Sequence, residues 1–575
     1  MTVAKNTGAV STPLNWDTIQ WETAKEEVMK LQVRISKATK QKRWAKVKSL
    51  QWILTHSFYA KCLAVKRVST NRGKSTPGVD KVILKNGREK LSMVSSLTRR
   101  GYKPQPLRRI YIPKSSGNKK RPLSIPTMYD RAQQALHTLA LTPIAETMAD
   151  YNSYGFREKR STADAIQRIY MAISQRRSVQ WILEGDIKGC FDNIDHKWLS
   201  KNVVTDQQML SKWLKAGYLE KGALFPTKAG TPQGSIISPC LANMVLDGME
   251  LALDKVFGGH QNLAQRKVRE ARRLVKHNGV KFCRYADDFI VTGASKELLE
   301  EKVKPIIREF LRERGLELSE EKTKVTHTTE GFDFLGQNVR RYVLKSGRSK
   351  LLIKPAAKNY KAFMSKVRKT IKEMPTVKQE ELILRLNPMI TGWANYHKHI
   401  VAKKMYNKLD HDIWLCLWRW AVRRHPNKGR RWISAKYFSP IKGNARPFNC
   451  KIKDETGETR KLVLTAASDT KIVRYVQITI KANPFDPEWE AFFEKRATYK
   501  MQNNKGGRQK LKTIWNYQKG ICPYCKESLS ESTSKSVIQY VKSRLKGGDV
   551  RVKNLNLLHR ECHEKAHQAK RCRQG

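Results

Sequence analysis

Acidic residues and long apolar runs are both scarce in this sequence. Its 575 residues include 51 Asp and Glu against 113 Lys and Arg, so the formal net charge at pH 7 is +62. No apolar run approaches the roughly 18 residues of a membrane-spanning helix, which argues against an integral membrane protein. The first thirty residues lack the apolar core of a signal peptide, and they contain acidic residues but no Arg, unlike a transit peptide. We therefore expect a cytoplasmic protein without a membrane partner.

The positive charge is spread through the whole chain. An excess of this size repels itself unless a partner neutralises it. A merely basic protein or a binder of acidic lipid is the alternative, but charge distributed over several domains favours a long polyanion such as RNA or DNA. At about 100–200 residues per domain, the length predicts three to five domains.

Apolar spacing predicts several helices and a few short strands. Helical spacing occurs over 21–68, as a hairpin with one basic face, and over 130–149, 162–176, 246–277 and 355–440. Short strands are predicted within 105–127, at 181–183 and as a hairpin at 282–291. Strands are also predicted over 445–480, and within 473–480 a period of two places Val476, Ile478 and Ile480 on one face. The basic, glycine-containing stretch 500–512 is predicted to be a linker.

Three acidic residues stand in a pattern that suits metal-dependent phosphoryl chemistry. Asp186 ends a short apolar run, and Asp287 and Asp288 lie at the centre of a predicted hairpin. Adjacent residues of a strand face opposite ways, so these two acids can converge only at a turn. Nucleotidyl transfer uses two Mg²⁺ ions about 3.5–4 Å apart, held by carboxylates on rigid elements. An ordinary hairpin turn is the alternative explanation for Asp287 and Asp288 taken alone.

Cysteine is scattered singly except near the end of the sequence. Four of the ten cysteines follow residue 520, namely Cys522, Cys525, Cys562 and Cys572. A Cys-x-x-Cys pair in a chain of this kind suggests metal binding before a disulfide.

Seven sequence blocks occur in an order that is specific to one family. They are IYIPKSSGNKKRPLSIPT, YGFREKRSTADAI, EGDIKGCFDNIDH, GTPQGSIISPCLANMVL, YADDFIV, GLELSEEKTKVTH and GFDFLG. With these blocks the chain resembles the group II intron-encoded proteins of bacteria and organelles, which are reverse transcriptases with maturase activity. ITGWANYH resembles their thumb or maturase domain, and CPYC with LLHRECH resembles an appended HNH endonuclease.

The resemblance implies a multidomain α+β protein built around a right-hand polymerase. We expect an N-terminal helical extension over 1–85, fingers and palm over 86–345, and a helical thumb or maturase domain over 346–440. A DNA-binding region over 441–514 and a zinc-containing ββα-type HNH domain over 515–575 would follow. The assignment of 441–514 depends on its position and positive charge alone.

The resemblance also implies roles for individual residues of the polymerase. Asp186 and Asp287 would bind the two Mg²⁺ ions with the backbone carbonyl of Ile187, and Asp288 would be the third acid. The residues expected to contact the incoming nucleotide are Lys114, Arg121, Phe191, Gln233 and Gly234. Phe191 would exclude a 2′-hydroxyl, with core packing as its alternative role. A missing side chain at Gly234 would let the backbone approach the nascent base pair.

The implied function is that of a reverse transcriptase and maturase. The protein would bind its group II intron RNA, assist splicing and reverse splicing into target DNA, and copy the RNA from dNTPs during target-primed retrohoming. A splicing cofactor that only binds RNA is the alternative, disfavoured because all three acids are present. A retron or diversity-generating reverse transcriptase is disfavoured by ITGWANYH and by the HNH-like end.

The C-terminal end resembles an HNH nuclease that keeps its zinc ligands and lacks part of its catalytic set. The expected ligands of a structural Zn²⁺ are Cys522, Cys525, His559 and Cys562. The His-His dyad of an active site aligns with Gln539 and Tyr540, while Asn554, His563 and His567 are retained. Gln cannot accept a proton near neutral pH, and Tyr, with a pKa of about 10, is a poor base. We expect cleavage of the second DNA strand to be lost or strongly weakened, with the zinc fold kept as a DNA-binding module.

Overall fold

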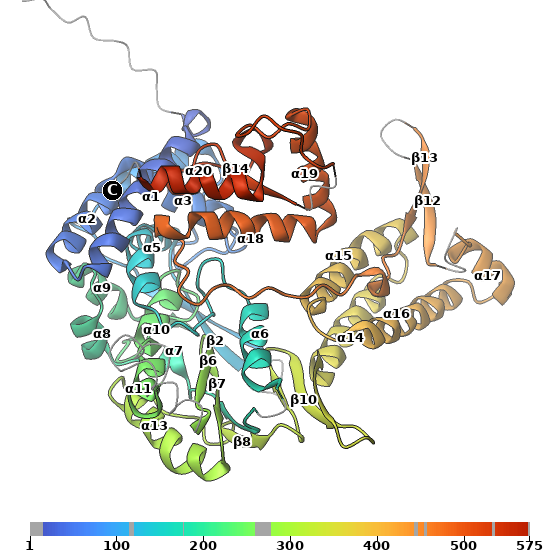
Figure 1. Cartoon of the computed structure of the whole chain (residues 1–575), viewed down its shortest axis with the longest axis horizontal. Helices are drawn as coiled ribbons and strands as arrows, with labels where there is room; N and C mark the ends of the chain where they lie inside the picture. Colours follow the sequence, from blue (N-terminus) through green and yellow to red (C-terminus); the bar gives the residue numbers. More distant parts are fainter. Residues whose placement is uncertain are drawn as a thin grey trace, which may run out of the picture.

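The computed structural model describes residues 15–113, 120–175, 178–258, 278–441, 447–453, 457–531 and 535–572. Figure 1 shows N-terminal helices and small sheets forming a body, a helical arm to one side, and a C-terminal region that returns to cover the N-terminal helices. Most of the predicted segment 246–277 lies outside the described residues. No helix in the described ranges is long and apolar enough to cross a membrane.

Three helices, rather than the predicted hairpin, cover residues 21–70. They are α1 (Trp21–Lys40), α2 (Trp44–His56) and α3 (Phe58–Thr70), followed by α4 (Gly87–Ser96). The prediction was wrong because the backbone of Ser57 is extended, with ψ of 128°, and separates two helices whose apolar spacing is nearly continuous. Val47, Leu54 and Val65 are buried in one core with the long helix α5 (Met128–Met148).

Two four-stranded sheets form the middle of the body. The first has the order β2-β1-β4-β5, from β1 (Leu107–Pro113), β2 (Lys120–Ile125), β4 (Tyr218–Glu220) and β5 (Ala223–Phe225). The second, called the central sheet below, has the order β6-β7-β3-β8. It contains β3 (Trp181–Gly185), β6 (Lys281–Tyr285), β7 (Asp288–Gly293) and β8 (Lys324–His327). The predicted strands at 181–183 and the hairpin at 282–291 are confirmed.

Short helices surround the central sheet and supply its apolar cover. They are α6 (Thr162–Ile173), α7 (Cys190–Asn193), α8 (His196–Asn202), α9 (Gln207–Leu214), α10 (Ser238–Leu246), α11 (Met249–Phe257) and α13 (Lys304–Arg312). Leu183 and Val291, on paired strands, are completely buried against this layer. The sheet edge that carries the acidic residues is therefore held on a rigid, packed support.

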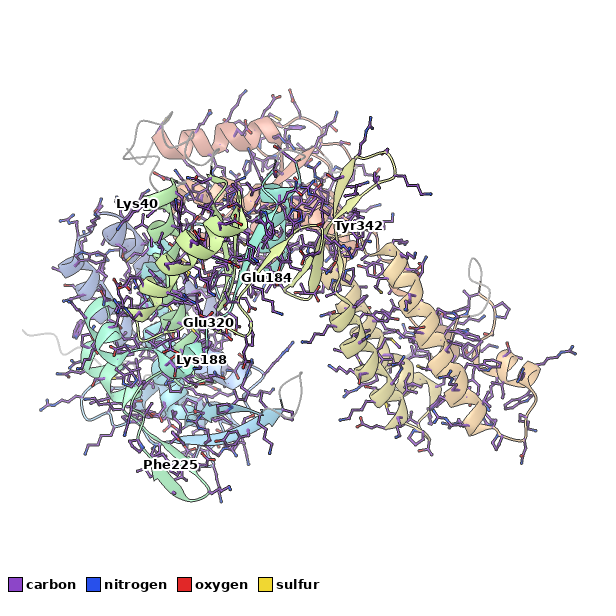
Figure 2. The ribbon with its side chains drawn as sticks, turned by 90° about the horizontal axis from the view of Figure 1, so that it is seen from below. Lys40, Glu184, Lys188, Phe225, Glu320 and Tyr342 are labelled. Atoms are coloured by element: carbon purple, nitrogen blue, oxygen red, sulfur yellow. The ribbon has the colours of Figure 1, made fainter. Side chains whose placement is uncertain are left out.

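A helical arm leaves the body through a three-stranded sheet. This sheet contains β9 (Phe332–Phe334), β10 (Gln337–Val343) and β11 (Ser349–Pro355). The arm contains α14 (Ala357–Lys372), α15 (Gln379–His397), α16 (Lys403–Arg424) and α17 (Arg430–Tyr437), as predicted for 355–440. Seen from below in Figure 2, it stands beyond Tyr342 of β10. Trp414 and Trp418 stack within it, 5.4 Å between ring centroids, and both contact Phe438.

The segment 471–480 is extended but is not a strand of any sheet in the described residues. Beyond the hairpin of β12 (Asn449–Lys453) and β13 (Thr459–Val463), the chain crosses from the arm to the body. The predicted common face is wrong, because Val476 is 50% exposed while Ile478 is 1% exposed. The backbone N–H of Ile478 donates to Asp164 of α6 at 2.8 Å, and that of Val473 donates to the carbonyl of Lys398. Polar anchors thus replace strand pairing.

The predicted linker at 500–512 is also wrong, because helices occupy most of it. The C-terminal region contains α18 (Glu490–Gln502), α19 (Lys505–Tyr517), β14 (Ser536–Tyr540), β15 (Leu555–His559) and α20 (Arg560–Cys572). Leu511 and Ile514 bury one face of α19 against the last hairpin. A Cβ at Gly507 would lie 2.4 Å from backbone atoms of Met501, so glycine there permits close packing of α18 and α19 rather than a loose connection.

The C-terminal region packs on the first helix of the chain. Lys542 pairs with Glu26 of α1, and Arg551 pairs with Glu22 at 3.3 Å. Gly547 lies so close to the backbone of Glu26 that a Cβ would be 2.4 Å from its Cα. The two ends of the described chain therefore form one contiguous surface.

Candidate functional site

The central sheet brings the three predicted acids to one edge. Gly185, the last residue of β3, pairs with Phe289 of β7, so the strand register places Asp186 opposite Asp288. A Cβ at Gly185 would lie 2.1 Å from the ring of Phe289, which is why glycine precedes the acid. Asp287 lies in the tight β6–β7 turn, where Ala286 has a φ of 59°. The turn allows two consecutive acids to face one site.

The acids repel one another in the absence of a cation. Burial raises the pKa of Asp287, and the Asp186 charge adds to this shift while Arg121 opposes it. Desolvation, followed by the charges of Asp287 and Asp186, raises the pKa of Asp288 to about 6. Lys322, which the sequence analysis did not single out, bonds to Asp186 at 2.6 Å. Its only signal was its place in the block GLELSEEKTKVTH.

Oxygen ligands that destabilise one another suit a hard divalent cation. Carboxylates are the ligands that Mg²⁺ prefers, and its charge would offset the burial and the repulsion that raise the pKa values of Asp287 and Asp288. Ile187, the residue after Asp186, is buried and forms an isolated antiparallel β-bridge with Leu318. The donor set therefore fits Mg²⁺. The three carboxylates are not, however, among the described groups whose ligand atoms all lie within 4.8 Å of one another.

The glycine-rich loop at 230–234 lies beside this edge and is tied to two elements. The N–H of Ser124 on β2 donates to the carbonyl of Gln233 at 2.7 Å. The N–H of Thr231 donates to the carbonyl of Phe191 at 2.6 Å. Gly234 has a φ of +105°, and a Cβ there would lie 3.2 Å from the carbonyl oxygen of Ser124. Glycine thus permits both the backbone conformation and the close approach.

Phe191 and Gln233 line one cavity of about 250 Å³. Its walls come from the loop, from β1, β2 and β4, and from the residues that follow Asp186. Within these walls, the guanidinium of Arg109 lies over the ring of Tyr218, with 3.8 Å between its Cζ atom and the ring centroid. Phe191 is half-buried and also contacts the apolar core around the central sheet. Arg121 is exposed on β2 and close enough to lower the pKa of Asp287. Lys114 lies outside the described residues.

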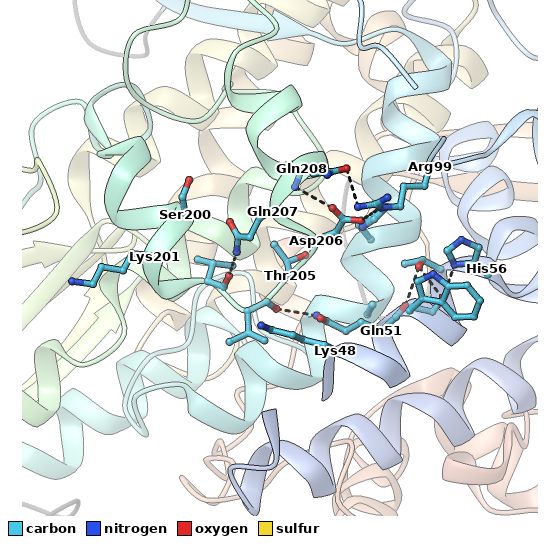
Figure 3. Close-up of a pocket in the computed structure, with 16 residues that line it drawn as sticks. Lys48, Gln51, His56, Arg99, Ser200, Lys201, Thr205, Asp206, Gln207 and Gln208 are labelled. Carbon is cyan, nitrogen blue, oxygen red and sulfur yellow. Dashed lines mark hydrogen bonds and ion pairs between the residues drawn. The ribbon is translucent and has the colours of Figure 1, made fainter. Parts of the chain in front are cut away.

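A second cavity, of about 670 Å³, lies away from the acids between α2 and the α8–α9 pair (Figure 3). Gln51 donates to the carbonyl of Val204 at 2.9 Å, and Arg99 pairs with Asp206. Trp52 is exposed at its rim and stacks on His56. These contacts join the N-terminal helices to the body, and no predicted site residue lines the cavity.

The four predicted zinc ligands come together in the C-terminal region. Their ligand atoms, on Cys522, Cys525, His559 and Cys562, all lie within 4.8 Å of one another. The Nε2 atom of His559 lies 3.0 Å from the carbonyl of Ser528, which leaves Nδ1 directed at the thiols. Burial opposes it, but backbone N–H groups of Cys525, His559 and Tyr524 lower the pKa of Cys522 to about 7. Three thiols and one oriented imidazole fit tetrahedral zinc.

The residues aligned with the HNH dyad are poorly placed for general-base chemistry. Tyr540 is 7% exposed, and burial raises its pKa further above the ordinary value. Gln539 is its neighbour on β14, and its buried Nε2 atom has no partner. Asn554 braces the loop that precedes the Gly547–Gly548 turn, since it bonds in both directions with the backbone of Lys542.

His563 and His567 point into the protein, toward a residue that the sequence analysis did not identify. Both Nε2 atoms contact the same carboxylate oxygen of Glu494 on α18, at 2.8 and 2.6 Å. The other oxygen of Glu494 accepts the N–H of Tyr540 at 2.8 Å. No sequence signal marked Glu494, because it lies 69 residues before His563 in an ordinary helical stretch.

Family comparisons match four successive parts of the chain. The matching families are described as N-terminal domain of reverse transcriptase (residues 16–97), reverse transcriptase (RNA-dependent DNA polymerase) (112–339), group II intron maturase-specific domain (360–438) and HNH endonuclease (522–569). A polymerase-type region, a maturase-type arm and a nuclease-type end therefore follow one another in a single chain.

Curated proteins are similar to about half or more of this chain. Group II intron-encoded protein LtrA of Lactococcus lactis subsp. cremoris is 35% identical over 50% of this chain and 56% of its own length. Protein YkfC of Escherichia coli is 32% identical over 49% of this chain and 81% of its own length. An uncharacterized 91 kDa protein in a cob intron of Schizosaccharomyces pombe is 27% identical. The chain belongs to the group II intron-encoded proteins, although its match spans only about half the length of LtrA.

Proposed function

We propose that this protein is the reverse transcriptase and maturase of a group II intron. The observation that carries the proposal is the meeting of Asp186, Asp287 and Asp288 at one edge of the central sheet, within the region matched to reverse transcriptases. In this assignment the two sheets are fingers and palm, and the helical arm is the thumb. The proposed domains are 1–85, 86–345, 346–440, 441–514 and 515–575.

The acidic edge would hold two Mg²⁺ ions through Asp186, Asp287 and the carbonyl of Ile187. When bound, the ions activate the primer 3′-hydroxyl and stabilise charge on the phosphates. Arg121, exposed above the acids, would pair with the triphosphate, and Lys114 would share that task. Phe191 would stand where the sugar of the incoming dNTP lies, and the backbone of Gln233 and Gly234 would support the nascent base pair. The bond formed joins the 3′-oxygen to the α-phosphorus, and pyrophosphate leaves.

The arm and the overall charge would serve the maturase function. Exposed arginines lie at the end of α16 and at the start of α17: Arg423, Arg430 and Arg431. Phosphates of the intron RNA are their expected partners, and target DNA is the expected partner of the region after residue 440. A net charge of +62 predicts RNA binding that weakens steeply with salt.

The C-terminal region would bind zinc and DNA but would not cleave the second strand. The buried Tyr540 cannot serve as a base at neutral pH, and His563 and His567 are engaged with Glu494. Retrohoming would then need a primer from another source, such as a nascent strand at a replication fork.

Primer extension on an RNA template tests the polymerase assignment. We expect the wild-type protein to make cDNA in Mg²⁺, and Asp287→Asn to reduce synthesis on the order of 10²–10³-fold or more while RNA binding is unchanged. The control is Glu309→Gln, on the exposed face of α13. Absence of cDNA from the wild-type protein would leave only the RNA-binding cofactor.

A further inference from the structure

A compact cluster of three buried side chains joins α18 to α20. The side chains of Glu494, His563 and His567 are 1%, 0% and 10% exposed. Their ligand atoms all lie within 4.8 Å of one another, a property shared in the described residues only with the cysteine cluster. His563 and His567 are four residues apart on one helix, so both imidazoles leave the same face.

The cluster has the chemistry of a transition-metal site. Two imidazoles and one carboxylate form a known ligand set for Zn²⁺, which binds nitrogen at about 2.0–2.1 Å and carboxylate oxygen at about 2.0–2.2 Å. Tetrahedral bonds of that length separate the ligand atoms by roughly 3.3 Å. The present Nε2–Oε2 distances are 2.8 and 2.6 Å. Small side-chain rotations therefore suffice to admit the ion.

The carboxylate is already oriented for this role. The N–H of Tyr540 donates to Oε1 of Glu494 at 2.8 Å, which holds the plane of the carboxylate and leaves Oε2 facing both imidazoles. A hydrogen-bonded ligating carboxylate of this kind is typical of the outer shell of metal sites.

We propose that Glu494, His563 and His567 bind a second Zn²⁺ ion, separate from the cysteine site. The third ligand comes from α18, outside the region matched to HNH endonucleases, and it takes the place of a ligand that Gln539 and Tyr540 of β14 do not supply. The site is structural, since its ligands are buried and β14 offers no base. It fastens the zinc hairpin to the helix that precedes it. This inference does not depend on polymerase activity.

Metal content of the purified full chain, after dialysis against a weak chelator, tests the proposal. We expect two zinc equivalents per chain in the wild-type protein, one in Glu494→Gln and one in His567→Ala. The matched control is Glu564→Gln on α20, an exposed acid paired with Lys495, which should keep two equivalents. One equivalent in the wild-type protein, with no other transition metal and no change in Glu494→Gln, would overturn the proposal and leave a hydrogen-bonded clasp.

X-ray absorption at the zinc edge on the wild-type protein gives an answer that does not depend on how the variants fold. The cysteine site supplies three sulfur ligands to one ion. Two filled sites would average about 1.5 sulfurs per zinc, with nitrogen and oxygen making up the remainder, whereas the cysteine site alone would give about three. An average near three sulfurs per zinc contradicts the second site.

Discussion

The polymerase-type edge and the nuclease-type end use the same kinds of element in opposite ways. At the central sheet, three acids meet at one edge, and burial together with mutual repulsion raises the pKa values of Asp287 and Asp288. At the C-terminal end, the retained histidines are buried, and both Nε2 atoms contact one carboxylate oxygen of Glu494. Like charges crowded at one edge are typical of a functional site, whereas buried side chains that contact one another are typical of a structural role.

The difference is what we expect if a nuclease-type fold serves as a structural support. The nuclease-type hairpin has the cysteine cluster, the Asn554 brace and two helical histidines. Glu494 contacts His563 and also accepts the backbone N–H of Tyr540 on β14. The packing of this region on α1, through Lys542 and Arg551, gives it a role in holding the two ends of the chain together.

The largest effect is expected when the zinc cluster is broken. Cys525→Ser removes one of four ligands from a site whose metal stabilises small zinc folds by about 10–16 kcal/mol in peptides. We expect the region after residue 515 to unfold, which limited proteolysis would detect as rapid cleavage there while primer extension persists. Cys572→Ser, at an exposed cysteine outside the cluster, is the control. Equal protease resistance in both variants would mean that apolar packing alone holds this region.

A smaller effect is expected at the glycine-rich loop of the polymerase edge. Gly234→Ala forces a residue with a Cβ to a φ of +105° beside the Ser124 carbonyl, at a cost of about 1–3 kcal/mol. We expect cDNA synthesis to fall about tenfold or more. Gly222→Ala, with a φ of +88° and open space around it, carries similar backbone strain without the contact. Equal loss of synthesis in both variants would show that strain, rather than position, matters.

The acidic repulsion predicts a variant that is more stable than the wild-type protein. Asp288→Asn removes a carboxyl group whose pKa is raised to about 6. After solvent screening, we expect the free energy of unfolding of the metal-free protein to increase by about 1 kcal/mol. Because the folded protein holds this proton more tightly than the unfolded chain, the wild-type stability that depends on Asp288 is present below about pH 4 and lost as pH rises through 6. Denaturant unfolding of both proteins in EDTA at pH 4.5 and 8 measures the difference in stability. A gain that is the same at both pH values would show that the charge of Asp288 is not its cause.

No effect at all is expected at the nuclease-type end in a cleavage assay. On a labelled duplex target, the intron ribonucleoprotein should insert RNA into one strand and leave the other intact, and His563→Ala should leave this pattern unchanged. Site-specific cleavage of the second strand by the wild-type complex, abolished in His563→Ala, would show that Tyr540 or another group acts as a base and that the contrast between the two regions is wrong.

Elements with strong local patterns followed directly from the amino-acid order. The strand before Asp186, the hairpin around Asp287 and the helices of 355–440 each carry their own apolar period, and all are present. Where the pattern was ambiguous, tertiary contacts decided. Val476, Ile478 and Ile480 alternate like a strand, but Asp164 captures the Ile478 backbone, and Gly507 in a basic stretch allows two helices to pack closely.

The two ligand clusters of the C-terminal region differ in how far the amino-acid sequence alone predicts them. Cys522 with Cys525 and His559 with Cys562 are pairs at short spacing, so each pair converges through one turn and only the meeting of the two pairs needs the fold. Glu494 meets His563 across 69 residues because α18 packs against β14 and α20. Its neighbours in the chain give no sign of this, since a buried acid on a helix is recognisable only by the side chains that surround it in space.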